Sequence, residues 1–164
     1  MNIPCDDIMK LQDYELISLI RDGIFDYLQE IPEDNLAKIP EVNFYLIAAS
    51  IFDMEMQNGG LCQFLMNAGR FHGAVLEEAL LAFGAERHAG LVSDFCKENK
   101  IDISNPQQFV PVSVEHYVRL YQEYPFEAFD QAYFALDQVC PLERMLGEYI
   151  RKHPSEFLGT EMYL

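Results

Sequence analysis

Two consecutive glycines interrupt a long helical pattern, and this break constrains the fold more than any other feature of the chain. Residues 41–57 form a helical pattern that is apolar on nearly every side over residues 44–52, which predicts a central buried helix. Asn58, Gly59 and Gly60 follow at once, and a further apolar helix is expected over residues 60–67. Asparagine and glycine suit the left-handed conformation at a helix C-terminus. We therefore predict a helix hairpin, with Asn58 and Gly59 left-handed and Gly60 allowing a close reversal.

Polar side chains flank this break within an apolar segment. Glu55 lies one turn before it, and Gln63 and Asn67 follow it at an i, i+4 spacing. Leaving such groups unpaired in a core costs roughly 1–3 kcal/mol each. One interpretation is structural: Glu55 accepts hydrogen bonds from free backbone N–H groups of the next helix, and the two amides cross-link neighbouring helices. The other is a polar pocket for a ligand or for catalysis, although these three residues include no nucleophile and no histidine.

Helical periodicity covers most of the remaining chain. The spacing predicts helices over residues 13–30 (with Asp13 as N-cap), 73–83, 86–98, 113–123, 126–135 and 142–152. The best strand candidate, residues 109–112, contains Pro111, which favours a loop or a sheet edge. We expect a single compact, all-α, multi-helix domain over residues 1–164, without a signal peptide or an apolar run of about 18 residues. Four separated cysteines fit buried free thiols in a cytoplasmic protein: Cys5, Cys62, Cys96 and Cys140.

Charge is the strongest compositional signal. The chain has 27 acidic and 11 basic residues and a formal net charge of −16, which repels nucleic acid and anionic membranes and attracts basic proteins. Four acids fall within an arc of about 80° on the helix over residues 13–30, and two more extend the acid beyond its end: Glu15, Asp22, Asp26 and Glu30, then Glu33 and Asp34. Successive carboxylates stand about 6 Å apart along the axis, within range of the ~3.4 Å phosphate spacing of a DNA strand. Both a solvated helix face and a surface for a cationic partner fit this pattern.

Signals for catalysis are weak. The four histidines have no metal-ligand spacing, and we expect His72 and His88 at helix ends or on the surface. No phosphate-binding glycine loop or nucleophile motif is present, so we expect no enzyme, metal or cofactor. Tyr117, Tyr121, Tyr124 and Phe129 surround a helix–proline–helix junction. They fit a core or a dimer interface, or alternatively an exposed protein-binding surface.

The motif around the glycine break resembles a family. It comprises Glu55, Asn58-Gly59-Gly60, Gln63-Phe64 and Asn67, and weaker matches follow at residues 129–133 and 146–154. Over about residues 40–158 the chain resembles small, acidic, all-helical bacterial proteins, a domain of unknown function that includes a DNA-mimic protein. The resemblance implies an all-α fold and a homodimer. It also implies an acidic surface, because the DNA-mimic member uses such a surface to occupy the DNA-binding face of a helix-turn-helix regulator.

We therefore expect a non-catalytic acidic domain that binds a basic nucleic-acid-binding protein by mimicking DNA. The partner-binding face would comprise Glu15, Asp22, Asp26, Glu30, Glu33 and Asp34. Direct binding to nucleic acid or to a membrane is not expected. Two alternatives are an immunity-type inhibitor of a cationic nuclease toxin, and a small ligand-binding or enzymatic domain with a pocket near Glu55.

Overall fold

The chain folds into helices joined by short loops. The computed structural model describes residues 10–110 and 112–158, and within these ranges it contains seven α-helices and no strand. The α-helices are α2 (Asp13–Glu30), α3 (Glu41–Asn67), α4 (Gly69–Ala82), α5 (Glu86–Asn99), α6 (Val114–Glu123), α7 (Phe126–Asp137) and α8 (Leu142–Lys152). Three short 3-10 helices are η1 (Glu33–Lys38), η2 (Gln107–Phe109) and η3 (Pro154–Glu156). The all-α prediction is confirmed, and the predicted boundaries agree closely except at α4, which begins four residues earlier.

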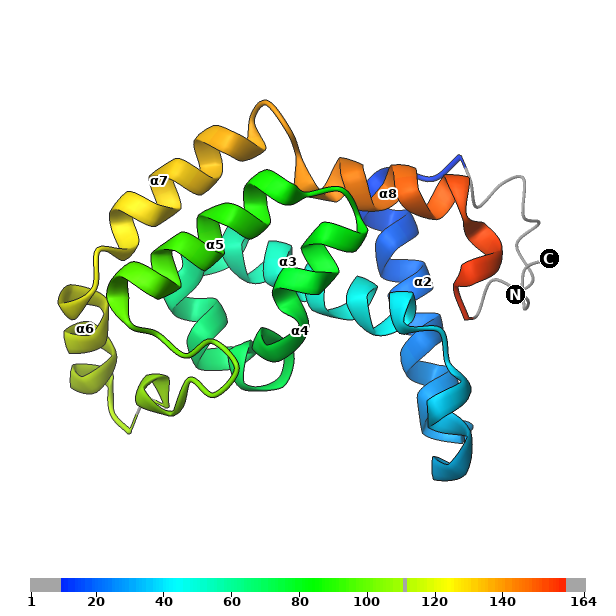
Figure 1. The fold of residues 1–164 in the computed structure, drawn as a ribbon, viewed down its shortest axis with the longest axis horizontal. Helices are drawn as coiled ribbons and strands as arrows, with labels where there is room; N and C mark the ends of the chain where they lie inside the picture. Colours follow the sequence, from blue (N-terminus) through cyan, green and yellow to red (C-terminus); the bar gives the residue numbers. More distant parts are fainter. Residues whose placement is uncertain (1–9, 111, 159–164) are drawn as a thin grey trace.

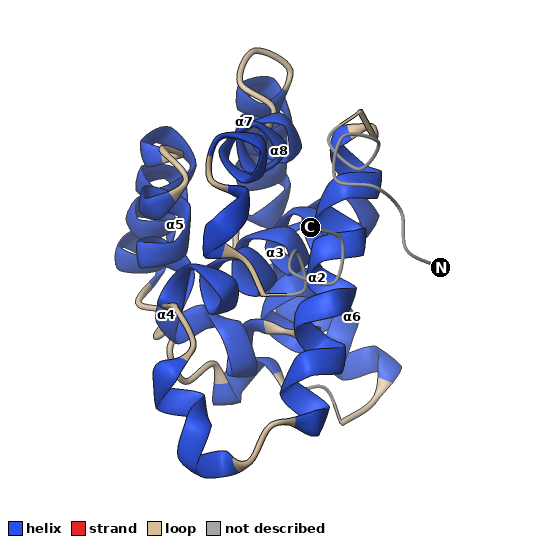
Figure 2. Ribbon diagram, turned by 90° about the vertical axis from the view of Figure 1, so that its right-hand side faces the viewer, coloured by secondary structure: helices blue, strands red, loops and turns tan. Residues whose placement is uncertain are grey.

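Helix α3 lies at the centre of the molecule, as its apolar sequence predicts (Figures 1 and 2). It packs against α2, α4, α7 and α8, and Leu46, Phe52 and Phe64 on it are fully buried. The Phe52 ring makes edge contacts with the rings of Phe64 and Tyr133, at centroid distances of 5.2 and 5.6 Å. Such contacts add to the burial of large aromatic surface. The core is therefore organised around α3.

The predicted hairpin at the Asn-Gly-Gly break is not confirmed. Instead of reversing, α3 consists of two helical segments joined across a kink, where Gly59 (φ −165°, ψ 17°) and Gly60 (φ 75°, ψ −172°) depart from helical geometry. Of the three residues at the break, Gly60 has the positive φ of the left-handed region, whereas Asn58 and Gly59 do not. The prediction that Asn58 and Gly59 would be left-handed was therefore wrong. The chain bends here because a glycine can adopt φ and ψ values that break the helical path.

Helix α2 begins one residue earlier than its predicted cap implied, at Asp13. Gln12 is the N-cap, and its backbone N–H donates to Glu15 at 3.1 Å. Asp13 lies inside the helix, where it forms an ion pair with Arg151 of α8. The Arg151 guanidinium also donates to the Leu11 carbonyl oxygen at 2.7 Å. The Asp13 carboxylate therefore joins α2 to α8 and does not cap the helix.

Most of the predicted aromatic cluster lies in the core. Phe129 is buried, and the half-buried rings of Tyr121 and Tyr124 lie 5.9 and 5.5 Å from the buried ring of Phe126. Tyr117 is exposed. The core interpretation therefore holds for three of the four residues. In the part of the chain that the structure describes, no helix has the length and apolar character needed to cross a membrane.

Candidate functional site

The motif around the glycine break is held together by its own side chains. The Glu55 carboxylate is buried, and its Oε2 accepts hydrogen bonds from Gln63 Nε2 at 2.7 Å and Asn67 Nδ2 at 3.1 Å. In a straight helix, residues 55 and 67 would lie about 18 Å apart along the axis, beyond the reach of these side chains. The kink at Gly59 and Gly60 therefore brings the carboxylate and both amides together.

A carboxylate from another helix caps the segment after the kink. Asp130 of α7 accepts a hydrogen bond from the Leu61 backbone N–H at 3.0 Å. Burial raises the pKa of Asp130, and the hydrogen bond from Leu61 opposes this effect. The prediction that Glu55 accepts hydrogen bonds from backbone N–H groups after the break was wrong. Its Oε2 accepts from the side-chain amides of Gln63 and Asn67, and the Leu61 backbone N–H donates to Asp130 instead. Gly60 is required at this contact, since an added Cβ would collide with the Asp130 carboxylate.

The predicted acidic face divides into two parts in the structure. Glu15 is half-buried at the N-terminal end of α2, where it accepts hydrogen bonds from the Gln12 N–H and from the Tyr14 hydroxyl at 3.3 Å. Asp22, Asp26 and Glu30 are exposed further along α2, and Glu33 is exposed at the start of η1. The Asp34 side chain lies outside the described residues. Glu15 therefore serves the helix start, while the other described carboxylates face solvent.

The exposed carboxylates belong to a segment that projects from the body of the molecule (Figure 1). We call residues 22–38, the C-terminal part of α2 together with η1, the acidic arm. It contains five acidic residues and one basic residue, Lys38, which donates to Asn35 at 2.7 Å. No residue of α2 after Ile24 is buried. The arm is thus a solvated surface of concentrated negative charge.

The carboxylates of the arm have few partners. Asp22 lies 3.6 Å from the guanidinium of Arg21, with 69% of its side chain exposed. Asp26, Glu30 and Glu33 make no hydrogen bond or ion pair with another described residue. Beside them, Phe25, Tyr27 and Leu36 are each about 40% exposed. The arm therefore presents unpaired charge and partly exposed apolar surface together, a combination that occurs at protein-binding surfaces.

A second acidic cluster, which the sequence analysis did not identify, lies where α2, α3, α7 and α8 meet. Its cavity of about 510 Å³ is lined by Asp13, Asp53, Gln57, Asp137, Pro141, Glu143 and Arg144. Asp53 is 9% exposed and accepts a hydrogen bond from the buried Tyr133 hydroxyl at 2.8 Å. Burial raises the pKa of Asp53 to about 6, and the hydrogen bond from Tyr133 opposes this rise. Asp53 and Gln57, two polar residues one turn apart just after the apolar stretch of α3, were the available sequence signal.

Neighbouring contacts explain why these carboxylates gather there. Asp137 accepts from the Leu142 backbone N–H at 2.9 Å, which caps α8, and from Gln57 Nε2 at 3.2 Å. Burial and the nearby Asp13 raise the pKa of Glu143. The described residues hold no group of three His, Cys, Asp or Glu side chains suited to a metal ion. The cluster can hold protons, and its described contacts otherwise join helices.

A buried histidine adjoins this network. His88 lies in the first turn of α5, but it is fully buried rather than on the surface. Neither ring nitrogen has a hydrogen-bond partner among the described residues. Its ring lies 5.7 Å from that of Tyr133, and burial lowers the pKa of His88. The neutral imidazole therefore acts mainly as an aromatic side chain in the core. His72 is half-buried, and burial also lowers its pKa.

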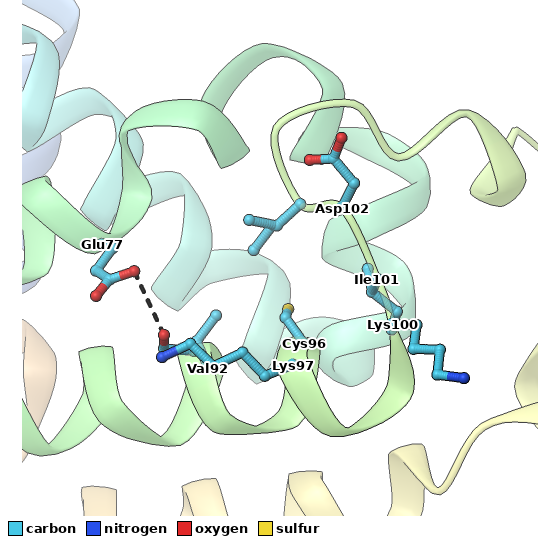
Figure 3. Close-up of a pocket in the computed structure, with 9 residues that line it drawn as sticks. Glu77, Val92, Cys96, Lys97, Lys100, Ile101 and Asp102 are labelled. Atoms are coloured by element: carbon cyan, nitrogen blue, oxygen red, sulfur yellow. Dashed lines mark hydrogen bonds between the residues drawn. The ribbon is translucent and has the colours of Figure 1, made fainter.

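A further groove of about 360 Å³ lies between α4, α5 and the loop after α5 (Figure 3). Lys97 and Lys100 line it together with Glu77 and Asp102, so its lining has no net charge. Glu77 accepts from the Ser93 hydroxyl at 3.4 Å. Burial raises the pKa of the Cys96 thiol in its wall to about 11, so this sulfur stays protonated near neutral pH. A protonated thiol is a weak nucleophile.

Fold and surface together define the chain as an acidic, all-helical domain with a kinked central helix. Comparison with protein families matches residues 37–153 to the model of the DMP19-like protein family. The chain therefore belongs to the DMP19-like family. No curated protein and no solved structure matches it. The kink and the Asp53 cluster lie almost wholly within the matched region, whereas the exposed carboxylates of the acidic arm precede it.

Proposed function

We propose that this protein is a non-catalytic binding domain that mimics DNA and occupies the nucleic-acid-binding face of a basic protein, such as a helix-turn-helix regulator. The observation that carries the proposal is the acidic arm. Asp22, Asp26 and Glu30 follow one line at i, i+4, i+8, and each like-charge pair costs an isolated helix roughly 0.2–0.5 kcal/mol. A cationic partner removes this repulsion when it binds.

The spacing of the carboxylates supports mimicry of a phosphate backbone. Residues four apart on a helix stand about 6 Å apart along its axis, and phosphates follow every ~3.4 Å along a DNA strand. Lysines and arginines placed to contact phosphates could therefore contact these carboxylates. Phe25 and Tyr27 beside them would add apolar contacts that DNA does not offer, and these contacts favour a protein partner.

Matched charge variants test the role of the arm. One variant neutralises the arm with Asp22→Asn, Asp26→Asn, Glu30→Gln and Glu33→Gln. The control neutralises four exposed acids elsewhere, with Glu78→Gln, Asp94→Asn, Glu98→Gln and Glu123→Gln. Both variants change the net charge equally. We expect the wild type and the control to capture the same basic protein from lysate at low salt, and the arm variant to lose it.

The captured protein then identifies the mechanism. After purification it should bind duplex DNA and the wild-type chain competitively, and its affinity for the chain should fall steeply as salt rises. Equal loss of capture by both variants would mean that only net charge matters. Simultaneous binding of DNA and the chain to the captured protein would refute mimicry.

An immunity-type inhibitor of a cationic nuclease would use the same arm. The identity of the captured protein distinguishes the two functions. A nuclease would lose its catalytic activity in the complex, whereas a regulator would lose its binding to operator DNA. The third alternative, a ligand pocket at Glu55, is less favoured because amides of the same helix already occupy the Glu55 Oε2.

A further inference from the structure

Asn58 differs from the other asparagines of the chain in two ways. It is the one asparagine that a glycine follows in the sequence. It is also exposed, and its side chain makes no hydrogen bond or ion pair with another described residue. The side chains of the other asparagines that the structure describes all form hydrogen bonds: Asn35, Asn43, Asn67, Asn99 and Asn105. Asparagine is thermolabile, and at residue 58 nothing holds its amide in place.

We propose that Asn58 is a site of spontaneous deamidation, which converts it to aspartate or isoaspartate. The Gly59 backbone nitrogen bonds to Asn58 Cγ, the Cγ–Nδ2 bond breaks, and Nδ2 leaves as ammonia with the Gly59 amide proton. Water then opens the cyclic imide. Hydrolysis at Cγ leaves aspartate, and hydrolysis at the main-chain carbonyl leaves isoaspartate, whose backbone runs through Cβ and Cγ.

The kink in α3 supplies the freedom that ring closure needs. In an unbroken helix, turning the peptide after Asn58 would disrupt the hydrogen bonds of the following turn. Here Gly59 and Gly60 already depart from helical geometry, and the Leu61 N–H donates to Asp130 of α7 at 3.0 Å. Gly59 has no Cβ, so the approach of its nitrogen to the Asn58 amide is open. Sequence and structure therefore place the reactive pair at the same point of α3.

Isoaspartate would lengthen the main chain by one carbon directly before two close contacts. An added Cβ at Gly59 would collide with the Gln63 side chain, and one at Gly60 would collide with the Asp130 carboxylate. A displaced backbone at these glycines therefore disturbs the hydrogen bonds of Gln63 with Glu55 and of Leu61 with Asp130. Aspartate keeps the length of the main chain and adds only an exposed charge. Isoaspartate at residue 58 thus loosens the kink, whereas aspartate does not.

Mass spectrometry of aged protein tests the modification, whatever the acidic arm binds. After incubation in mildly alkaline buffer at physiological temperature, the peptide with residue 58 should carry an acid in place of the amide. Protein isoaspartyl methyltransferase should label the aged wild type and should not label aged Asn58→Gln. Peptides containing Asn35 or Asn99 in the same sample serve as internal controls and should keep their amides. An aged wild type that keeps the Asn58 amide, or that converts Asn35 and Asn99 equally, would overturn the proposal.

Urea unfolding tests the effect on the kink. Ageing should lower the urea midpoint of the wild type and leave that of N58Q unchanged. Fresh Asn58→Asp carries the same charge on a normal backbone and should unfold close to the fresh wild type. Repair by the methyltransferase, which returns isoaspartate to aspartate, should restore the midpoint of the aged protein. Isoaspartate-containing protein as stable as N58D would overturn the loosening of the kink.

Discussion

The Asp53→Asn substitution tests whether the buried carboxylate at the α3–α7 contact destabilises the fold near neutral pH. Burial raises the pKa of Asp53 from 3.8 to about 6. The folded protein therefore keeps a proton that the unfolded chain releases between about pH 4 and pH 6. Stability falls as pH rises through this window, and the loss is complete above pH 6. A difference of about two pKa units corresponds to about 3 kcal/mol.

Asparagine cannot ionise, and its Oδ1 can still accept the hydrogen bond of the Tyr133 hydroxyl. We expect D53N and the wild type to differ little in free energy of unfolding at pH 4. At pH 7 the variant should be more stable by up to about 3 kcal/mol. Urea unfolding followed by circular dichroism across this pH range measures the difference, with exposed Asp22→Asn as the control. A difference between D53N and the wild type that does not change with pH would refute the reasoning.

Two further substitutions test the kink and the buried histidine. Gly60→Ala should destabilise the protein by at least ~2 kcal/mol, because its φ of 75° disfavours a side chain and the new Cβ would displace Asp130. Gly84→Ala should lower the free energy of unfolding by less, because Gly84 has a φ of 73° but open space around it. Gly90→Ala, at a helical position with open space, should stabilise α5. Equal effects of the three substitutions in urea unfolding would contradict this account. His88→Phe should stabilise the protein by about 1–2 kcal/mol, because it removes buried nitrogens that have no described partner. Thermal and urea unfolding measure this effect, and a loss of stability would show that the imidazole makes a contact the core needs.

Much of the fold could be predicted because its signals are local. The apolar residues of α2, α7 and α8 recur at spacings of three and four, and prolines and glycines mark where helices end. Pro125 and Pro141 each precede the first residue of a helix, as predicted. The glycine break was also visible, because no other residue type accepts the conformation of Gly60 so readily.

The tertiary structure decided which side chains meet. Asp130 caps Leu61 from 69 residues away, and Tyr133 reaches Asp53 across 80 residues. No spacing rule relates residues so far apart, so the sequence supplied the carboxylates without their partners. The same limit applied to Glu15. The helical wheel grouped it with Asp22, but in the structure its carboxylate accepts a hydrogen bond from the Gln12 backbone N–H at the start of α2.

The sequence by itself therefore determined the helices, the position of the break and the excess of negative charge. The tertiary structure alone separated the solvated acids of the arm from the buried Asp53. The physical reason is that helical periodicity depends on neighbours within a few residues, whereas burial depends on how distant segments pack. A carboxylate becomes a cap, a proton-holding group or a binding surface according to what packs against it.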